Sequence, residues 1–73
     1  MELTEESINQ DIKAYNERKA AAIAKINRLP LKGRHAGETR KLNAERRKLV
    51  AEVAHVDTLI GYAREALGRI LCN

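Results

Sequence analysis

Apolar residues recur at intervals of three and four along two stretches of the chain. In the second half, apolar side chains keep this spacing at Leu42, Leu49, Val53, Val56, Ile60, Ala63, Leu67 and Ile70, with Arg46 as the one interruption. In the first half, the repeat comprises Ile8, Ile12, Tyr15, Ala22 and Ile26, interrupted by Lys19. This spacing places the apolar side chains along one side of an α-helix, so the pattern predicts two helices that each form a seam.

The ends of the first helix are predicted by a hydroxyl residue and a proline. Thr4 can cap the helix, because its hydroxyl can accept a hydrogen bond from a backbone N–H that has no partner in the first turn. Pro30 disfavours helical geometry at Leu29, so the helix is expected to stop at about Arg28. The sequence therefore predicts a first helix over about residues 4–28.

The start of the second helix is less sharply marked. Gly33 and Gly37 continue the break that Pro30 begins. We expect the helix to begin near residues 37–39, with Gly37 or Thr39 as its cap. The apolar repeat then predicts a second helix over about residues 38–71.

The connection between the two predicted helices is short, which makes them antiparallel neighbours. If the hairpin closes just beyond Ile26 and Leu42, Lys19 lies opposite Leu49. Lys19 and Arg46 are expected to lay their carbon chains on the seam and keep their charges in water. The sequence thus predicts an all-α fold, an antiparallel two-helix hairpin.

The chain is short, and the predicted hairpin leaves apolar side chains uncovered. Its 73 residues form one domain, residues 1–73, whose core contributes only a few kcal/mol of stability. The second helix is expected to extend beyond the first at its C-terminal end. Self-association into a homodimeric four-helix bundle, or a protein partner, would cover the remaining face, for which the candidates are Leu59, Tyr62, Leu67, Ile70 and Leu71.

Small residues line one side of the second predicted helix. Ala54, Gly61 and Gly68 recur every seven residues. A glycine inside a helix costs about 1 kcal/mol relative to alanine, so two on one line suggest that another helix approaches closely. The alternative is that they are tolerated glycines on a solvent-exposed surface.

The formal net charge of +4 is distributed unevenly along the chain. Residues 18–48 contain eleven Lys or Arg side chains against two acidic ones, whereas residues 1–17 contain five acidic side chains against one lysine. In an antiparallel hairpin, the middle of the chain becomes one physical end. That end is expected to attract phosphates or an acidic protein surface, and the candidate binding residues are Arg28, Lys32, Arg34, His35, Arg40, Lys41, Arg47 and Lys48. The alternative is that these charges only solvate the helix ends and the loop.

The sequence lacks the motifs that mark enzymes, metal sites and cofactor sites. A glycine-rich phosphate loop, an HExxH motif and a nucleophile in a recognisable context are all absent, so we expect no enzyme, no metal site and no cofactor. Cys72 is the single cysteine, which excludes an internal disulfide. The acidic, polar N-terminus and the lack of a long apolar run predict a protein that is cytoplasmic and does not enter membranes.

The segment RLPLKGRHAGETRK, residues 28–41, forms the turn of the predicted hairpin. In size, hairpin pattern and this turn, the chain resembles small bacteriophage-encoded regulators that dock on host RNA polymerase. The resemblance implies a regulator or inhibitor in the bacterial host cytoplasm, with the turn against acidic polymerase surface or nucleic acid. The apolar helix face would then bind a protein segment.

Two alternatives remain open. The segment VDTLIGYAREALGR, residues 56–69, resembles the second helix of phage proteins that sequester cyclic nucleotides, although the N-terminal segment and turn of that family are absent. That resemblance implies a sponge for a small anionic ligand. The third reading is a structural helical-bundle protein, for which only self-association matters.

Overall fold

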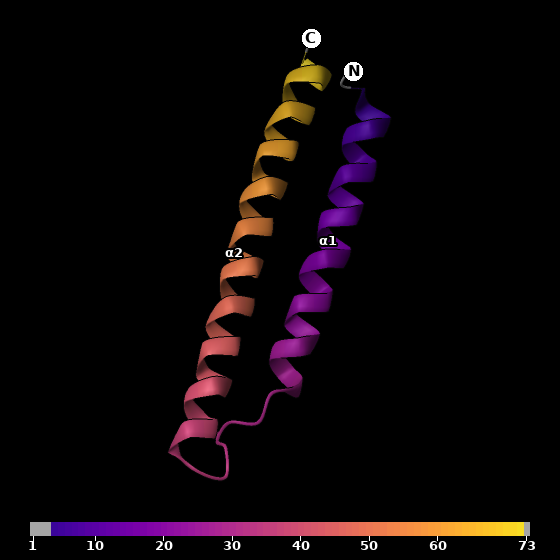
Figure 1. Cartoon of the computed structure of the whole chain (residues 1–73). Helices are drawn as coiled ribbons and strands as arrows, with labels where there is room; N and C mark the ends of the chain where they lie inside the picture. The colour runs from indigo at the N-terminus through magenta and orange to yellow at the C-terminus, as the bar shows by residue number, and fades with distance from the viewer. Residues whose placement is uncertain (1–3, 73) are drawn as a thin grey trace.

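The fold is an antiparallel hairpin of two helices. The computed structural model describes residues 4–72, in which α1 spans Glu5–Arg28 and α2 spans Ala36–Cys72. The helices run side by side in opposite directions, with residues 29–35 joining them at one end (Figure 1). The predicted all-α hairpin is confirmed, and each predicted helix boundary lies within two residues of the observed one.

The start of α1 is held by a reciprocal pair of hydrogen bonds. The backbone N–H of Ser7 donates to Thr4 Oγ1 at 3.1 Å, and the backbone N–H of Thr4 donates to Ser7 Oγ at 3.2 Å. This capping box satisfies two backbone donors that the helix itself leaves unpaired. Glu5 and Glu6 add negative charge at the positive end of the helix dipole. Thr4 is therefore the cap that the sequence predicted.

The end of α1 follows from Pro30. The helix ends at Arg28, and Leu29 has an extended backbone with φ −71° and ψ 131°. A residue before proline avoids helical geometry because the proline ring would clash with it. Lys25 and Arg28 occupy the last turn, where positive charge is favourable.

The cap of α2 is His35, so the expectation of Gly37 or Thr39 was wrong. The backbone N–H of Glu38 donates to His35 Nδ1 at 3.2 Å, and the backbone N–H of Thr39 donates to the His35 carbonyl at 3.0 Å. An unprotonated imidazole nitrogen accepts a hydrogen bond as a capping oxygen would. Thr39 instead fastens the loop, since its hydroxyl donates to the His35 carbonyl and accepts from the Gly33 N–H.

Replacing His35 by alanine is expected to lower the free energy of unfolding by about 1 kcal/mol, because the Glu38 N–H loses its acceptor. His35→Asp is expected to recover this loss, since a carboxylate caps well and complements the helix dipole. Urea denaturation followed by circular dichroism measures both variants. An aspartate variant that is no more stable than the alanine variant would contradict the capping role.

The core between the helices is thin. In the described part of the chain, the buried apolar residues are Ile8, Ala22, Val56 and Ile60. Val56 is wholly buried. Half-buried side chains of the two seams flank this core, among them Ile12, Tyr15, Ile26, Leu49, Val53 and Leu67. The apolar repeats therefore meet as predicted, but they enclose few side chains.

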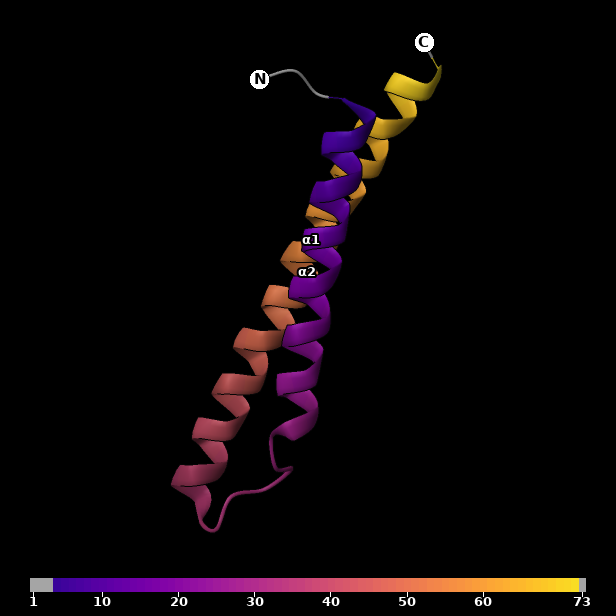
Figure 2. The ribbon, with the colours of Figure 1, turned by 90° about the vertical axis from the view of Figure 1, so that its right-hand side faces the viewer.

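The helices pair in a different register from the expected one. Lys19 Nζ lies 2.7 Å from Asp57 Oδ1. Asp57 is roughly two turns further along α2 than Leu49, the residue expected opposite Lys19. Arg46 donates to the Pro30 carbonyl at 2.8 Å and to Asn43 Oδ1 at 2.9 Å, so both charged interruptions of the seam are bound within the hairpin. The loop returns alongside the first turns of α2, and α2 therefore extends past the end of α1 at the loop end (Figure 2).

Candidate binding surfaces

The predicted cationic residues gather at the loop end of the hairpin. We call this set the basic tip: Arg28, Lys32, Arg34, His35, Arg40, Lys41, Arg47 and Lys48, all of which are exposed. They come from the last turn of α1, the loop and the first turns of α2. Arg47 and Lys48 lie about three turns along α2 and form the margin of the tip. The hairpin thus brings together residues that are up to twenty positions apart in the sequence.

The charges of the basic tip are not neutralised by ion pairs. Within residues 4–72, the ion pairs are Arg18–Glu52 at 2.6 Å, Lys19–Asp57 at 2.7 Å and Glu65–Arg69 at 3.7 Å. None of them includes a residue of the basic tip. Glu38 and Glu45 are the carboxylates within this stretch of the chain, and Glu38 accepts a hydrogen bond from the Arg34 backbone N–H at 3.2 Å.

Other basic residues of the middle segment hold the hairpin together. Arg18 donates from Nε and Nη2 to Glu52 Oε1, across the two helices. Arg46 binds the loop through the Pro30 carbonyl. These two guanidinium groups are thus already engaged, although sequence alone grouped them with the rest of the positive charge.

The predicted helix-face residues do not form one surface. Leu59, Leu67 and Ile70 are half-buried, whereas Tyr62 is 65% exposed and Leu71 is 62% exposed. Tyr62 and Leu71 are nine residues apart, which at about 100° per residue places them on opposite sides of α2.

Sequence reasoning missed one exposed apolar side chain of α1. Ile23 is 39% exposed and is not a member of the seam repeat. On α2, Val50 is 53% exposed beside the seam. Ile23 directly follows the seam residue Ala22, and Val50 directly follows the seam residue Leu49. This shared position beside the seam is the sequence signal that could have identified them as a pair.

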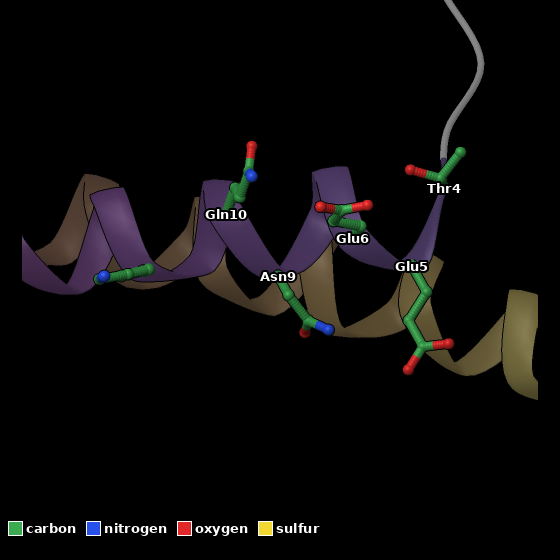
Figure 3. A pocket seen from close by; sticks show the side chains of 6 residues that line it. Thr4, Glu5, Glu6, Asn9 and Gln10 are labelled. Carbon is green, nitrogen blue, oxygen red and sulfur yellow. The ribbon is translucent and has the colours of Figure 1, made fainter.

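The surface depressions are open and belong to single helices. One is lined by the first turns of α1, where Glu5 and Gln10 point to opposite sides (Figure 3). Another lies on α2 and is lined by Asn43, Arg46, Arg47, Val50, Ala51 and Ala54. Neither lies between the two helices, so neither resembles a site that encloses a small molecule.

Residues 4–72 contain no candidate metal centre and no candidate membrane span. Across that range, no three His, Cys, Asp or Glu side chains are grouped so that they could hold a metal ion. Neither of the described helices combines the length and the apolar character needed to cross a membrane. Cys72 is a free, exposed thiol.

The two segments that suggested known families lie in different parts of the hairpin. Residues 28–41 form the loop and the adjoining helix ends, and residues 56–69 lie in the second half of α2. Comparison with protein-family models, with curated proteins and with solved structures finds no match to this chain.

Proposed function

We propose that this protein is a small non-catalytic binding protein that docks through its basic tip on a macromolecular machine. The type of partner we propose is host RNA polymerase, with the protein acting as a phage-type regulator or inhibitor. The observation that carries the proposal is the concentration of exposed cations, without carboxylate partners in ion pairs, at one end of a hairpin 57 Å long.

The loop within the basic tip is held in place by hydrogen bonds to α2, three of them to residues before His35. The Gly33 N–H donates to Thr39 Oγ1 at 3.0 Å, and the Arg34 N–H donates to Glu38 Oε2. Arg46 donates to the Pro30 carbonyl. A loop that is already ordered loses less conformational entropy on binding than a flexible tail does. The arrangement therefore favours a surface of defined shape over a diffuse basic segment.

The side chains of the basic tip favour a protein surface as the partner. Leu31 is 86% exposed in the loop, beside Lys32. An apolar side chain surrounded by cations suits an acidic protein surface that has an apolar pocket. Neither of the two tyrosines, Tyr15 and Tyr62, lies in the loop, so the aromatic ring there is the His35 imidazole, which is already held as the cap of α2 rather than free to stack on a nucleic-acid base.

Reversing two charges of the basic tip, Arg40→Glu with Lys41→Glu, is expected to weaken binding to purified bacterial RNA polymerase about tenfold or more. The matched control is Lys13→Glu with Arg69→Glu, which changes the net charge equally at exposed positions away from the tip. Biolayer interferometry measures both affinities, and circular dichroism checks that helicity is unchanged. Equal weakening by the two pairs would show that only total charge matters.

A capture experiment from bacterial lysate tests the class of partner. The tagged protein is incubated at two salt concentrations, with and without nuclease, and captured proteins are identified by mass spectrometry. Polymerase subunits that remain after nuclease treatment would support the proposal. Loss of all captured material on nuclease treatment would indicate nonspecific nucleic-acid binding and contradict it. Saturable binding of a cyclic nucleotide to the purified protein would indicate the sponge instead.

A further inference from the structure

We propose that a second copy of this chain covers the broad face of the hairpin marked by Lys19 and Asp57, and that the two hairpins lie antiparallel. Each loop end would then lie beside the helix ends of the other copy. This inference concerns a different surface from the basic tip and does not depend on the partner proposed above.

The two cross-helix ion pairs identify the face. Arg18 and Lys19 are adjacent in sequence, and they leave the seam on opposite sides to reach Glu52 and Asp57. With about 100° between successive residues, Ile23 lies on the same side of α1 as Lys19. By the same geometry, Val50, Ala54, Gly61 and Gly68 lie on the same side of α2 as Asp57. We call this surface the Asp57 face.

The Asp57 face carries apolar and small residues around the partly exposed Lys19–Asp57 ion pair, and it is uncovered in the monomer. Ile23 and Val50 are 39% and 53% exposed, and Ala54, Gly61 and Gly68 are exposed as well. A Cβ atom added at Gly61 or Gly68 would meet nothing within 4 Å. Because the hairpin buries so few side chains of its own, covering this face would add the apolar burial that the fold lacks.

The face is large enough for a stable dimer. The hairpin measures 57 Å by 19 Å along its two longest axes. A face of these dimensions offers roughly 1,000 Å² per protomer, or about 2,000 Å² in total for two copies, which is the upper end of the standard range for specific protein–protein interfaces. A second copy that covered only part of the Asp57 face would still bury an area typical of a stable interface.

The distribution of charge selects the antiparallel orientation. Residues 18–48, near the loop, contain eleven basic and two acidic side chains, whereas residues 5–17 contain four acidic side chains and one basic one. Parallel hairpins would place two basic ends side by side. Antiparallel hairpins place each basic end beside the acidic half of α1 in the other copy, which is electrostatically complementary.

The shape of the Asp57 face agrees with this orientation. Val50 projects from the half of α2 nearer the loop, and Gly61 and Gly68 lie in the other half. A two-fold axis near Asp57 relates Val50 to a position between the two glycines. That position is Arg64, so each copy would place Val50 over Arg64 of the other, on a stretch of α2 where the flanking glycines allow the helices to approach closely.

The first experiment compares Gly61→Leu with Ala44→Leu, which adds leucine at an exposed position away from the Asp57 face. Sedimentation equilibrium is expected to show a wild-type dimer of 8.2 kDa chains. Gly61→Leu is expected to raise the dimer dissociation constant about tenfold or more, and Ala44→Leu is expected to leave it unchanged. Leucine favours helix more than glycine, so weaker association cannot be attributed to a weaker helix.

The second experiment tests orientation by disulfide trapping in a Cys72→Ser background. Val50→Cys protein mixed with Arg64→Cys protein is expected to give a mixed disulfide, identified by mass, and Val50→Cys alone is expected to give little dimer. Disulfide formation requires Cα atoms within about 7 Å. Efficient self-linking of Val50→Cys would overturn the antiparallel arrangement. A monomeric wild-type protein at all concentrations tested would overturn the whole inference.

Discussion

Ile60→Ala is expected to lower the free energy of unfolding by about 2–5 kcal/mol and to leave the hairpin largely unfolded in dilute solution. Ile60 is only 6% exposed and lies in the middle of α2, against α1. The substitution removes buried methyl and methylene groups and leaves a cavity that two helices cannot readily close. Urea denaturation followed by circular dichroism measures the change.

The size of this effect is large relative to the stability of the whole domain. A single core in a chain of this length rarely supplies more than about 3–5 kcal/mol. The other buried residues of the described chain are Ile8, Ala22 and Val56, so no large remaining core compensates for the loss. If the second copy docks as proposed, raising the protein concentration will partly restore the helicity of the variant.

Leu31→Ala is the control for the core substitution. It removes an aliphatic side chain of the same size from a position that is 86% exposed, and its expected effect on stability is within about 0.5 kcal/mol. Equal destabilisation by the two substitutions would contradict the placement of the core. Leu31→Ala also tests the proposed function, because it is expected to weaken polymerase binding while the fold remains intact.

Gly33→Ala is expected to destabilise the loop end by about 1–3 kcal/mol. A Cβ atom at this position would lie 2.7 Å from Glu38 Cβ and 2.7 Å from the Thr39 backbone nitrogen. Glu38 Cβ is fixed to the helix backbone, and the backbone of the first turn of α2 cannot move without loss of its cap. The hydrogen bond from the Gly33 N–H to Thr39 Oγ1 would be strained or broken.

Gly37→Ala provides the comparison for this prediction. A Cβ atom at Gly37 would meet only the His35 imidazole, at 3.3 Å, so the ring would have to move by a few tenths of an ångström, a shift small enough to keep the hydrogen bond from the Glu38 N–H. We expect a small change in stability, since alanine also favours the helix. Thermal unfolding measures both variants. If Gly33→Ala were as stable as Gly37→Ala, the close packing of the loop on α2 would be wrong.

The eight residues of the basic tip show how much of the candidate site sequence could locate. Their place at the loop end follows from two facts that sequence supplies, a helical hairpin and a middle segment rich in lysine and arginine. Sequence could not separate them from Arg18 and Arg46, whose charges are engaged by Glu52 and by the Pro30 carbonyl. Glu52 lies 34 positions from Arg18, and Pro30 lies 16 positions from Arg46, so no rule based on neighbouring residues predicts these contacts.

The two helices, the Thr4 cap and the stop before Pro30 could all be predicted from the sequence, because each depends on periodicity or on contacts within one turn. The register and the position of the Asp57 face depend instead on contacts between the helices, and the path of the loop sets which residue, His35 rather than Gly37 or Thr39, caps α2. A loop of seven residues, 29–35, can follow many paths, and its path here depends on contacts with α2 that form only when the hairpin closes. That closure sets which side chains meet and which remain exposed.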